Sequence, residues 1–597
     1  MAENTGNSPR WQLDSIFPAL SGPEFEEARA RAAELITTLE NLTADGPARD
    51  AGAAEHALRL YEEAAETLQR IGAFVALTVA TDAFNEEALA VESALAPLGV
   101  RFSIVNKRFT AWAGTLDLPA LERESDFIAD RAHALGRQAF LAGKLLPQAA
   151  EEIAAALMPT GGSAWSQLHG QLISRETVRV KSPGLEVTEH GLAALFSLQH
   201  DPDRDVRRAA WQAELELLER NSLSYAAAMN AIKGEAGELA RRRGWDSALD
   251  EALYGDGIDR DTLQAMQGAV KDAFPLLRRY LKAKAGALGL ERLSWYDLFA
   301  PLEQAGGSTY TWEEAKEFIL TQFRAYSDDL ADFAERTFRE GWHDGPSRPG
   351  KTNGAFCASV GAVQESRILL NFGGTLNDLF TLAHELGHAF HNEQMFRQNR
   401  SPLQRRTPMT LAETASIFCE TVVFNAFTEQ ADAAGRLAAL EQDLSGAAQL
   451  VLDIHSRFLF EDGVFEKRAE RELSITELKD LMLAAQQETY GDALSEDERN
   501  PWMWAHKGHY YIPGRSYYNY PYTFGWLFGL GLYAEYGREP EGFEERYADL
   551  LAGSGMAPAA ELAGGFGIDI RSEEFWRRSL VVLEERINEY ERLLAGA

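Results

Sequence analysis

The segment His384-Glu-Leu-Gly-His388 has the residue types and the spacing of a catalytic metal site. Residues i and i+4 share one face of an α-helix, so His384 and His388 can both direct an imidazole at one zinc ion. Glu385 follows the first histidine, where a general base for a water at the open metal position belongs. The pattern predicts metal-dependent hydrolysis, but it is short and needs support from its surroundings.

The surrounding residues favour a buried helix from Leu376 to about Phe396. Thr375 and Asp378 have the spacing of a capping box at its start, and Gly387 is the only glycine inside it. The segment also carries enough apolar residues to be buried, namely Leu379, Leu382, Ala383, Leu386 and Phe390. A helix of this kind holds metal ligands rigidly and away from bulk water.

A third ligand is expected in the helical run Met409–Phe424. Catalytic zinc takes three protein ligands and keeps one position open. Glu413 and Glu420 stand out there, because buried carboxylates are rare unless they are paired or bound to metal. We assign Glu413, 29 positions after His384, as the third ligand of one Zn²⁺ per chain. Glu420 is assigned as a second-shell partner of a ligand imidazole; the alternative is that Glu420 is itself the third ligand.

This arrangement resembles the M3 metallopeptidases, and within them the oligoendopeptidase F branch. The resemblance rests on the zinc motif with Glu413, on His391 and on segments 348–357 and 368–384, and it extends to the opening Trp11–Pro18. It implies a mainly α fold with a small β-sheet beside the zinc helix. It also implies a deep internal channel that admits short unfolded peptides. His391 is a further second-shell candidate, although it and Glu420 can equally be structural hydrogen-bonding groups.

The tyrosine-rich stretch 506–525 is the other candidate part of the site. By resemblance, His509 and Tyr520 match the histidine and tyrosine that stabilise the oxyanion beside the zinc, and His509 is preferred over His506. Four more tyrosines are weaker candidates for substrate binding: Tyr510, Tyr511, Tyr517 and Tyr518. The alternative is a packed aromatic loop without a catalytic role.

Two short apolar segments before the zinc helix, 354–361 and 366–372, are expected to be strands. A strand edge beside a metal site can pair with an extended peptide through main-chain hydrogen bonds, which tolerates many side chains. The alternative is that these strands only cover the core.

The remainder of the chain is rich in amphipathic helical patterns. We place a boundary near residue 190, after the turn at Lys181-Ser-Pro-Gly184, which divides an N-terminal helical domain (1–190) from a catalytic domain (191–597). The formal net charge of −33 argues against nucleic acid as a partner. With two cysteines, no signal peptide and a longest apolar stretch (522–533) too short to span a bilayer, we expect a cytoplasmic protein without a membrane partner.

The sequence therefore predicts a zinc-dependent endopeptidase that acts on oligopeptides. One alternative is an exopeptidase of a related zinc clan, either a carboxypeptidase or a dipeptidase. Another is a peptide-binding protein with structural zinc, against which Glu385 argues, because a structural site needs no base. The oligomeric state and the cleavage preference do not follow from the sequence.

Overall fold

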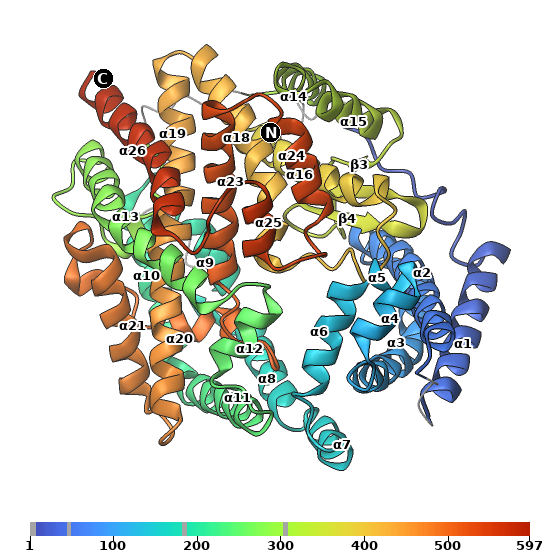
Figure 1. Ribbon diagram of the computed structural model, residues 1–597. Coiled ribbons are helices and arrows are strands. Elements are labelled where there is room, and N and C mark those ends of the chain that lie inside the picture. The colour runs from blue at the N-terminus through green and yellow to red at the C-terminus, as the bar shows by residue number, and fades with distance from the viewer. Residues whose placement is uncertain (1–7, 45–48, 182–187, 303–308, 597) are drawn as a thin grey trace. The chain divides into compact units, whose positions relative to one another are not determined.

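The computed structural model describes residues 8–44, 49–181, 188–302 and 309–596. The chain is 72% helical, and the strands of the described residues form only two small sheets. The prediction of a mainly α fold is therefore confirmed (Figure 1). Part of the turn used to place the domain boundary, Ser182–Gly184, lies outside the described residues.

The chain forms two compact units, and each collects three separate stretches. The first unit contains Met1–Leu145, Ser308–Ala426 and Glu535–Ile568, and the second contains Leu146–Gly307, Phe427–Ala534 and Asp569–Ala597. The predicted boundary at residue 190 divides the chain into two contiguous parts, which differ from these two units, and it stays a prediction. A proline-glycine turn marks where the chain bends, but it does not reveal which distant segments pack together.

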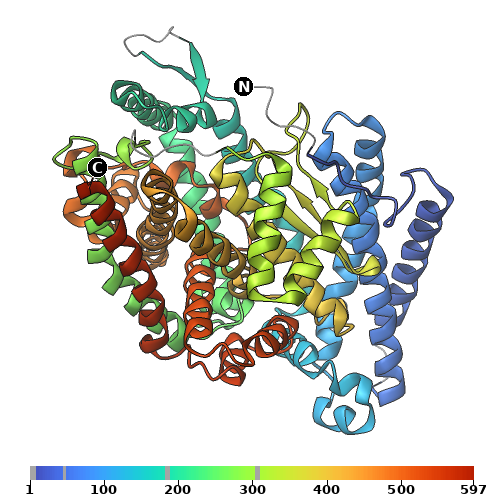
Figure 2. The ribbon, with the colours of Figure 1, turned by 90° about the horizontal axis from the view of Figure 1, so that it is seen from above.

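The first unit combines a helical layer with a small sheet. Its first three helices, drawn in blue in Figures 1 and 2, pack against one another. The helices of this unit are α1 (Pro23–Ala44), α2 (Ala51–Thr81), α3 (Glu86–Ala113), α4 (Leu118–Glu124), α5 (Asp126–Ala129), α6 (Ala132–Ala142), α14 (Trp312–Tyr326), α15 (Asp328–Arg339), α16 (Leu376–Arg397), α17 (Met409–Ala412), α24 (Phe543–Ala552), α25 (Ala559–Gly565) and the start of α18 (Thr414–Gln430).

The sheet of this unit has the order β3-β5-β4 and lies against α16. Strand β3 (His343–Asp344) is parallel to β5 (Glu365–Leu369), which pairs antiparallel with β4 (Phe356–Val360) in the register Cys357↔Ile368. The predicted strands, and their place beside the helix that carries His384 and His388, are thus confirmed. Because β5 is central, β4 is an edge strand.

The N-terminal segment completes the core beneath this sheet. Trp11, Ile16 and Phe17 are buried in one cluster with Val360 and Leu369 of the sheet. The segment is also tied by Arg367 of β5, which donates to the carbonyl oxygen of Gln12 at 2.8 Å and to Ser15 Oγ at 2.7 Å. The opening residues therefore support the strands that pack against α16.

The described residues of the second unit are helical apart from one short antiparallel pair of strands. Helices α13 and α26 lie side by side in it, green and red in Figures 1 and 2. Its elements are α7 (Gln148–Leu157), α8 (Gly162–Arg175), β1 (Thr177–Arg179), β2 (Glu189–Gly191), α9 (Leu192–Leu198), α10 (Arg204–Arg220), α11 (Ser222–Arg242), α12 (Ala248–Gly255), α13 (Arg260–Ala287), η1 (Trp295–Asp297), α19 (Ala433–Ala448), η3 (Gln449–Asp453), α20 (Ile454–Arg468), α21 (Ile475–Tyr490), α22 (Met503–His506), η6 (Gly508–Tyr511), α23 (Tyr520–Arg538, which continues into the first unit) and α26 (Glu573–Gly596).

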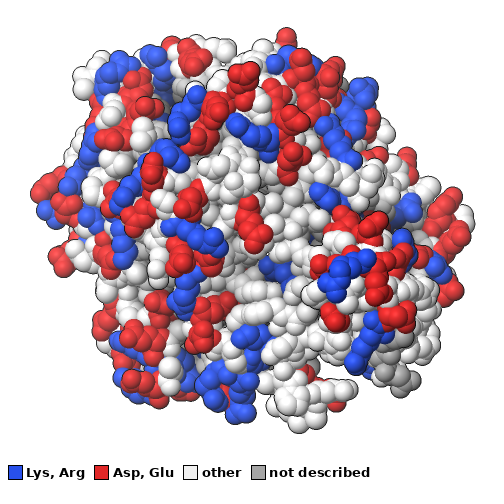
Figure 3. Space-filling view, in the orientation of Figure 1, with Lys and Arg blue, Asp and Glu red and all other residues white. Residues whose placement is uncertain are grey.

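Helix α3 is the one helix of the described residues whose length and composition would allow it to cross a membrane. Its mean hydropathy reaches 1.5 over 18 residues, and 11% of that window is buried. It packs against α1, α2 and α6. On the face drawn in Figure 3, acidic and basic side chains of the described residues are interspersed.

Candidate metal centre

Helix α16 presents two histidines on one face. It starts at a full capping box, in which Thr375 accepts from the backbone of Asp378 and the Asp378 side chain accepts from the backbone of Thr375. Its apolar side chains are buried as predicted, and the helix runs unbroken to Arg397. The rings of His384 and His388 lie with centroids 4.9 Å apart at 84°. Both imidazoles therefore point toward a common region.

Glu413 lies at a break in the second helical run, which the sequence predicted to be continuous. Helix α17 ends at Ala412, Glu413 has φ −86° and ψ 3°, and α18 begins at Thr414. The ψ value near zero redirects the chain for one residue. Ser416 Oγ lies 2.7 Å from Glu413 Oε2 and donates to it, which holds the carboxylate in place. The sequence reasoning missed this serine, although a hydroxyl three residues after a helix-start acid is a readable signal.

The three predicted ligands come together at distances that suit a metal ion. Glu413 Oε2 lies 3.2 Å from His384 Nε2 and 3.4 Å from His388 Nε2. Ligands about 2.0–2.1 Å from a tetrahedral zinc are about 3.3 Å from one another. The three residues also form the only described cluster of His, Cys, Asp and Glu side chains whose spacing could hold a metal. The donor set and its spacing thus fit zinc.

Gly387, between the two histidines, allows the close approach of the Glu413 segment. A Cβ at this position would lie 2.4 Å from Ala415 O and 2.6 Å from Ser416 Cα, both backbone atoms. The backbone of α18 can therefore reach α16 only where the side chain is a hydrogen.

Gly387→Ala is accordingly expected to push the start of α18 away and to weaken zinc binding by at least about 10-fold. Overpacking of this kind also costs roughly 1–3 kcal/mol of stability. Chelator competition measures the zinc Kd and thermal unfolding measures the stability. The control is Gly72→Ala in α2, where a Cβ meets nothing within 4 Å. Zinc affinity equal to wild type in Gly387→Ala would show that the contact does not position Glu413.

Glu420 contacts a ligand imidazole, whereas His391 is bonded elsewhere. His384 Nδ1 donates to Glu420 Oε2 at 3.0 Å, which leaves Nε2 of His384 for a metal. His391 Nε2 lies 3.1 Å from the carbonyl oxygen of Leu551 and 2.9 Å from Ser554 Oγ. Its described hydrogen bonds thus tie α16 to the α24 region, and its role in supporting the metal ligands stays a prediction.

The electrostatics of the cluster favour positive charge between the carboxylates. Burial alone would lower the pKa of His384, but hydrogen bonds to Glu413 and Glu420 outweigh it and hold that pKa well above its ordinary value. Burial likewise opposes ionisation of Glu413, yet His384 and His388 hold the pKa of this carboxyl far below its usual range. Two carboxylates around one imidazole thus attract a cation, whether a proton or a metal ion.

Glu385 is buried in the same cavity as the three ligands. The cavity has about 440 Å³ and is lined by His384, His388 and Glu413 together with residues of β4. Glu385 is 5% exposed, and its Oε2 has no hydrogen-bond partner among the described protein atoms. Burial raises the pKa of this carboxyl, and a bound cation nearby would lower it again. An unpartnered carboxylate oxygen beside a metal triad suits a general base.

One wall of this cavity is the edge strand β4. Phe356, Cys357 and Ser359 line the cavity from this strand. Both cysteines are free thiols, Cys357 in the wall and Cys419 in the core. Cys357 is not part of the described cluster of possible metal ligands.

In the second unit, His509 lies beside two aromatic rings that also contact each other. Its ring centroid is 4.6 Å from that of Tyr518 and 6.3 Å from that of Tyr522. Its Nδ1 donates to Asn519 Oδ1 at 2.7 Å. Tyr520, by contrast, is 1% exposed, and its hydroxyl donates to Asp256 at 2.8 Å. For Tyr520 to donate to an oxyanion as predicted, its hydroxyl has to leave Asp256. Sequence reasoning did not single out Tyr522, whose ring lies beside His509.

Three of the four tentative substrate-binding tyrosines are core residues in this structure. Tyr510, Tyr511 and Tyr517 are at most 3% exposed. The Tyr511 ring stacks on His169 at 3.6 Å, and the Tyr517 hydroxyl donates to Asp462 at 2.9 Å. This burial favours the packed-loop alternative for these three, and only Tyr518 of the four is half-exposed.

The sequence is similar to known peptidases over most of its length. The sequence pattern of peptidase family M3 matches residues 197–582. Group B oligopeptidase PepB of Streptococcus agalactiae is 28% identical over 490 residues, which are 80% of this chain and 78% of that protein. Oligopeptidase PepF of Bacillus subtilis is 25% identical over 453 residues, 75% of this chain and 66% of that protein.

Solved structures share the fold. A putative peptidase from Chlamydophila abortus superposes with a TM-score of 0.84 at 19% identity and covers 98% of this chain and 99% of its own. Oligoendopeptidase-F from Enterococcus faecium has a TM-score of 0.71 at 21% identity and covers 96% of this chain and 99% of its own.

Proposed function

Because the chain belongs to peptidase family M3, we propose that it is a zinc-dependent oligoendopeptidase that hydrolyses internal bonds of short unfolded peptides. One observation carries the proposal. His384, His388 and Glu413 meet at tetrahedral spacing, and the buried, unpartnered Glu385 lines the same cavity. A structural metal site needs no such base.

His384, His388 and Glu413 are the residues that would hold the zinc. When bound, zinc lowers the pKa of water and polarises a carbonyl oxygen. Glu385 takes the proton from the attacking water and passes it to the leaving amine as the scissile bond breaks. Glu420 holds His384 in the tautomer that keeps Nε2 free.

His509 is proposed to stabilise the oxyanion that forms at the scissile carbonyl. Because Asn519 accepts from Nδ1, the other ring nitrogen is left for substrate, and it donates to the oxyanion when the imidazole is protonated. Tyr520 stays a candidate for a second donor, and Tyr518 and Tyr522, whose rings lie beside His509, are further candidates. Each such donor typically lowers the barrier by roughly 3–4 kcal/mol.

The edge of β4 is the proposed place for the peptide backbone. Main-chain pairing to Phe356–Val360 recognises an extended chain without reading its side chains. Oligopeptides are therefore the expected partners, and nucleic acid and membranes are not. The names of the relatives agree with peptide substrates, and a cytoplasmic location remains part of the proposal.

The test is cleavage of an internally quenched peptide blocked at both ends. We expect mass spectrometry to find internal cuts, chelation to stop them and stoichiometric zinc to restore them. Cleavage restricted to peptides with a free terminus would instead establish the exopeptidase alternative. Stoichiometric binding of peptide without turnover, in zinc-loaded protein, would establish the peptide-binding alternative.

Glu420→Ala is expected to weaken zinc binding by about 10–100-fold while leaving the three ligands in place. The reason is that His384 Nδ1 loses its acceptor and the ring loses its fixed orientation. The zinc Kd from chelator competition measures this. Glu420→Gln retains an acceptor oxygen and is the matched control. Equal affinities for the two variants would argue against the orienting role.

A further inference from the structure

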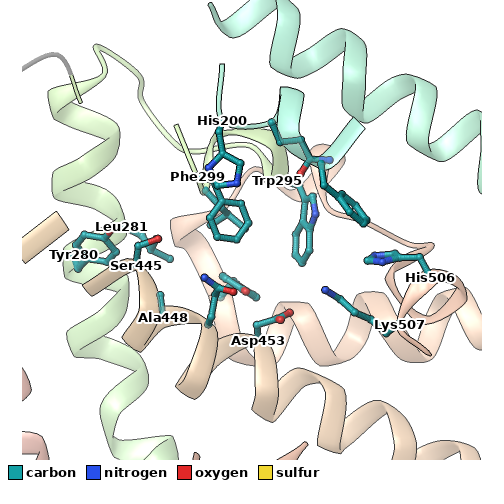
Figure 4. A pocket seen from close by; sticks show the side chains of 15 residues that line it. His200, Tyr280, Leu281, Trp295, Phe299, Ser445, Ala448, Asp453, His506 and Lys507 are labelled. Carbon is teal, nitrogen blue, oxygen red and sulfur yellow. The ribbon is translucent and has the colours of Figure 1, made fainter. Parts of the chain in front are cut away.

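A second cavity, of about 140 Å³, lies wholly within the second unit, and none of the residues proposed for catalysis lines it. One side is aromatic and includes Phe196, Trp295 and His200, whose ring stacks on Phe299 at 5.2 Å. Figure 4 shows the rings of His200, Trp295 and Phe299 on one side of the cavity. An enclosure of this kind suits an apolar group.

The opposite side carries two unlike charges. In Figure 4, the Asp453 carboxylate and the Lys507 ammonium both reach into the cavity. No ion pair joins them in the described part of the chain. Asp453 is 6% exposed; one oxygen accepts from Arg457, and the other, Oδ1, has no described partner. Burying an unpartnered carboxylate oxygen is costly, so this oxygen points to a ligand.

The backbone beside these charges is also irregular. Residues Gln449–Asp453 form a π-helical turn between α19 and α20, and both Gln449 and Asp453 line the cavity. Such turns cost helix stability and occur frequently at functional sites. The turn adds a backbone feature to the side-chain evidence for a built site.

We propose that this cavity binds a free α-amino acid with an apolar side chain. Lys507 pairs with the ligand carboxylate, Asp453 Oδ1 accepts from the ligand ammonium, and the side chain lies among Phe196, Trp295 and Phe299. The volume matches the apolar side chain of such a ligand, since a cavity of about 150 Å³ holds one benzene ring. A charged side chain would be left unpaired against the aromatic wall.

The site is connected by hydrogen bonds to His509. Arg457, the partner of Asp453, donates to Asn519 Oδ1 at 3.2 Å, and His509 donates to the same oxygen at 2.7 Å. A ligand ammonium that binds Asp453 therefore alters the carboxylate that holds Arg457. Through Arg457, the change reaches the hydrogen bonds that Asn519 accepts from Arg457 and His509. This link to turnover rests on the proposed function, whereas binding itself does not.

Calorimetric titration of the full-length zinc-loaded protein with L-phenylalanine and L-leucine tests the site. We expect one ligand per chain and at least 10-fold weaker binding of L-phenylalaninamide, which lacks the carboxylate, and of N-acetyl-L-phenylalanine, which lacks the ammonium. L-Glutamate and L-lysine should not bind. Absence of phenylalanine and leucine binding, or equal binding of the blocked compounds, overturns the proposal.

Lys507→Met locates the ligand. It removes the charge but keeps the length, and it should lower phenylalanine affinity at least 10-fold and abolish the preference over phenylalaninamide. Lys271→Met on α13, whose ammonium is exposed, is the matched control and should bind like wild type. Wild-type affinity in Lys507→Met would place the ligand elsewhere and overturn the proposal.

Turnover of a quenched peptide then tests the link. A change of at least two-fold in kcat at saturating peptide, lost in Lys507→Met, supports it. A change in KM alone indicates competition at the peptide site and overturns the link. Binding measured by calorimetry separates this result from failure of the peptidase proposal.

Discussion

Glu385→Gln is expected to lower kcat for peptide hydrolysis by about 10²–10⁴-fold while zinc content stays at one per chain. The amide has the shape of the carboxylate but cannot take a proton from water. Glu385 lies at the wall of the metal cavity and is not one of the three clustered ligands, so its replacement leaves the metal-binding atoms unchanged. Steady-state kinetics and elemental analysis of the same preparation provide the two readouts.

The matched control is Glu340→Gln, an exposed glutamate of the same unit, which should retain wild-type kcat. A glutamine at 385 also removes a buried carboxyl whose pKa burial raises, so the fold should not be weakened. Wild-type turnover in Glu385→Gln with zinc bound would refute the assigned base.

The metal-binding half of the site was predictable because it depends on local geometry. The i, i+4 spacing of His384 and His388, the capping box at Thr375 and the apolar face of α16 follow from residues within one helix, and the structure has all three. Membership of the M3 family and the metallopeptidase class were likewise predicted correctly, since the motif segments are contiguous in the sequence. Glu413 was found because a buried carboxylate needs a partner.

The remainder depends on contacts between distant segments, which one sequence does not display. The role of Gly387 arises only from the backbone of Ala415 and Ser416 opposite it. Asp256 accepts from the Tyr520 hydroxyl although it lies 264 residues away in the chain, so no local pattern indicates that this tyrosine is engaged. Nothing in the sequence separated the four weaker tyrosine candidates from one another, whereas packing buries Tyr510, Tyr511 and Tyr517 and leaves Tyr518 accessible.

Glu413→Gln is expected to weaken zinc binding by more than about 100-fold, beyond the range for an orienting partner such as Glu420. The amide can still accept from Ser416, so the break at residue 413 should survive, but a neutral oxygen is a poor zinc ligand. A 100-fold weaker Kd lowers zinc-induced stabilisation by about 2.7 kcal/mol at a zinc concentration far above both Kd values. The measurements are chelator competition and the shift of Tm on adding zinc.

The exposed Glu429 on the same helix gives the control variant Glu429→Gln, which should bind zinc like wild type. The comparison with Glu385→Gln is decisive, because the two isosteric changes separate the two roles. Loss of rate with zinc retained belongs to the base, and loss of rate together with zinc belongs to the ligand. Retention of tight zinc binding by Glu413→Gln would remove the third ligand from the site and leave Glu420 as the carboxylate to test next, because it contacts His384 from the other side.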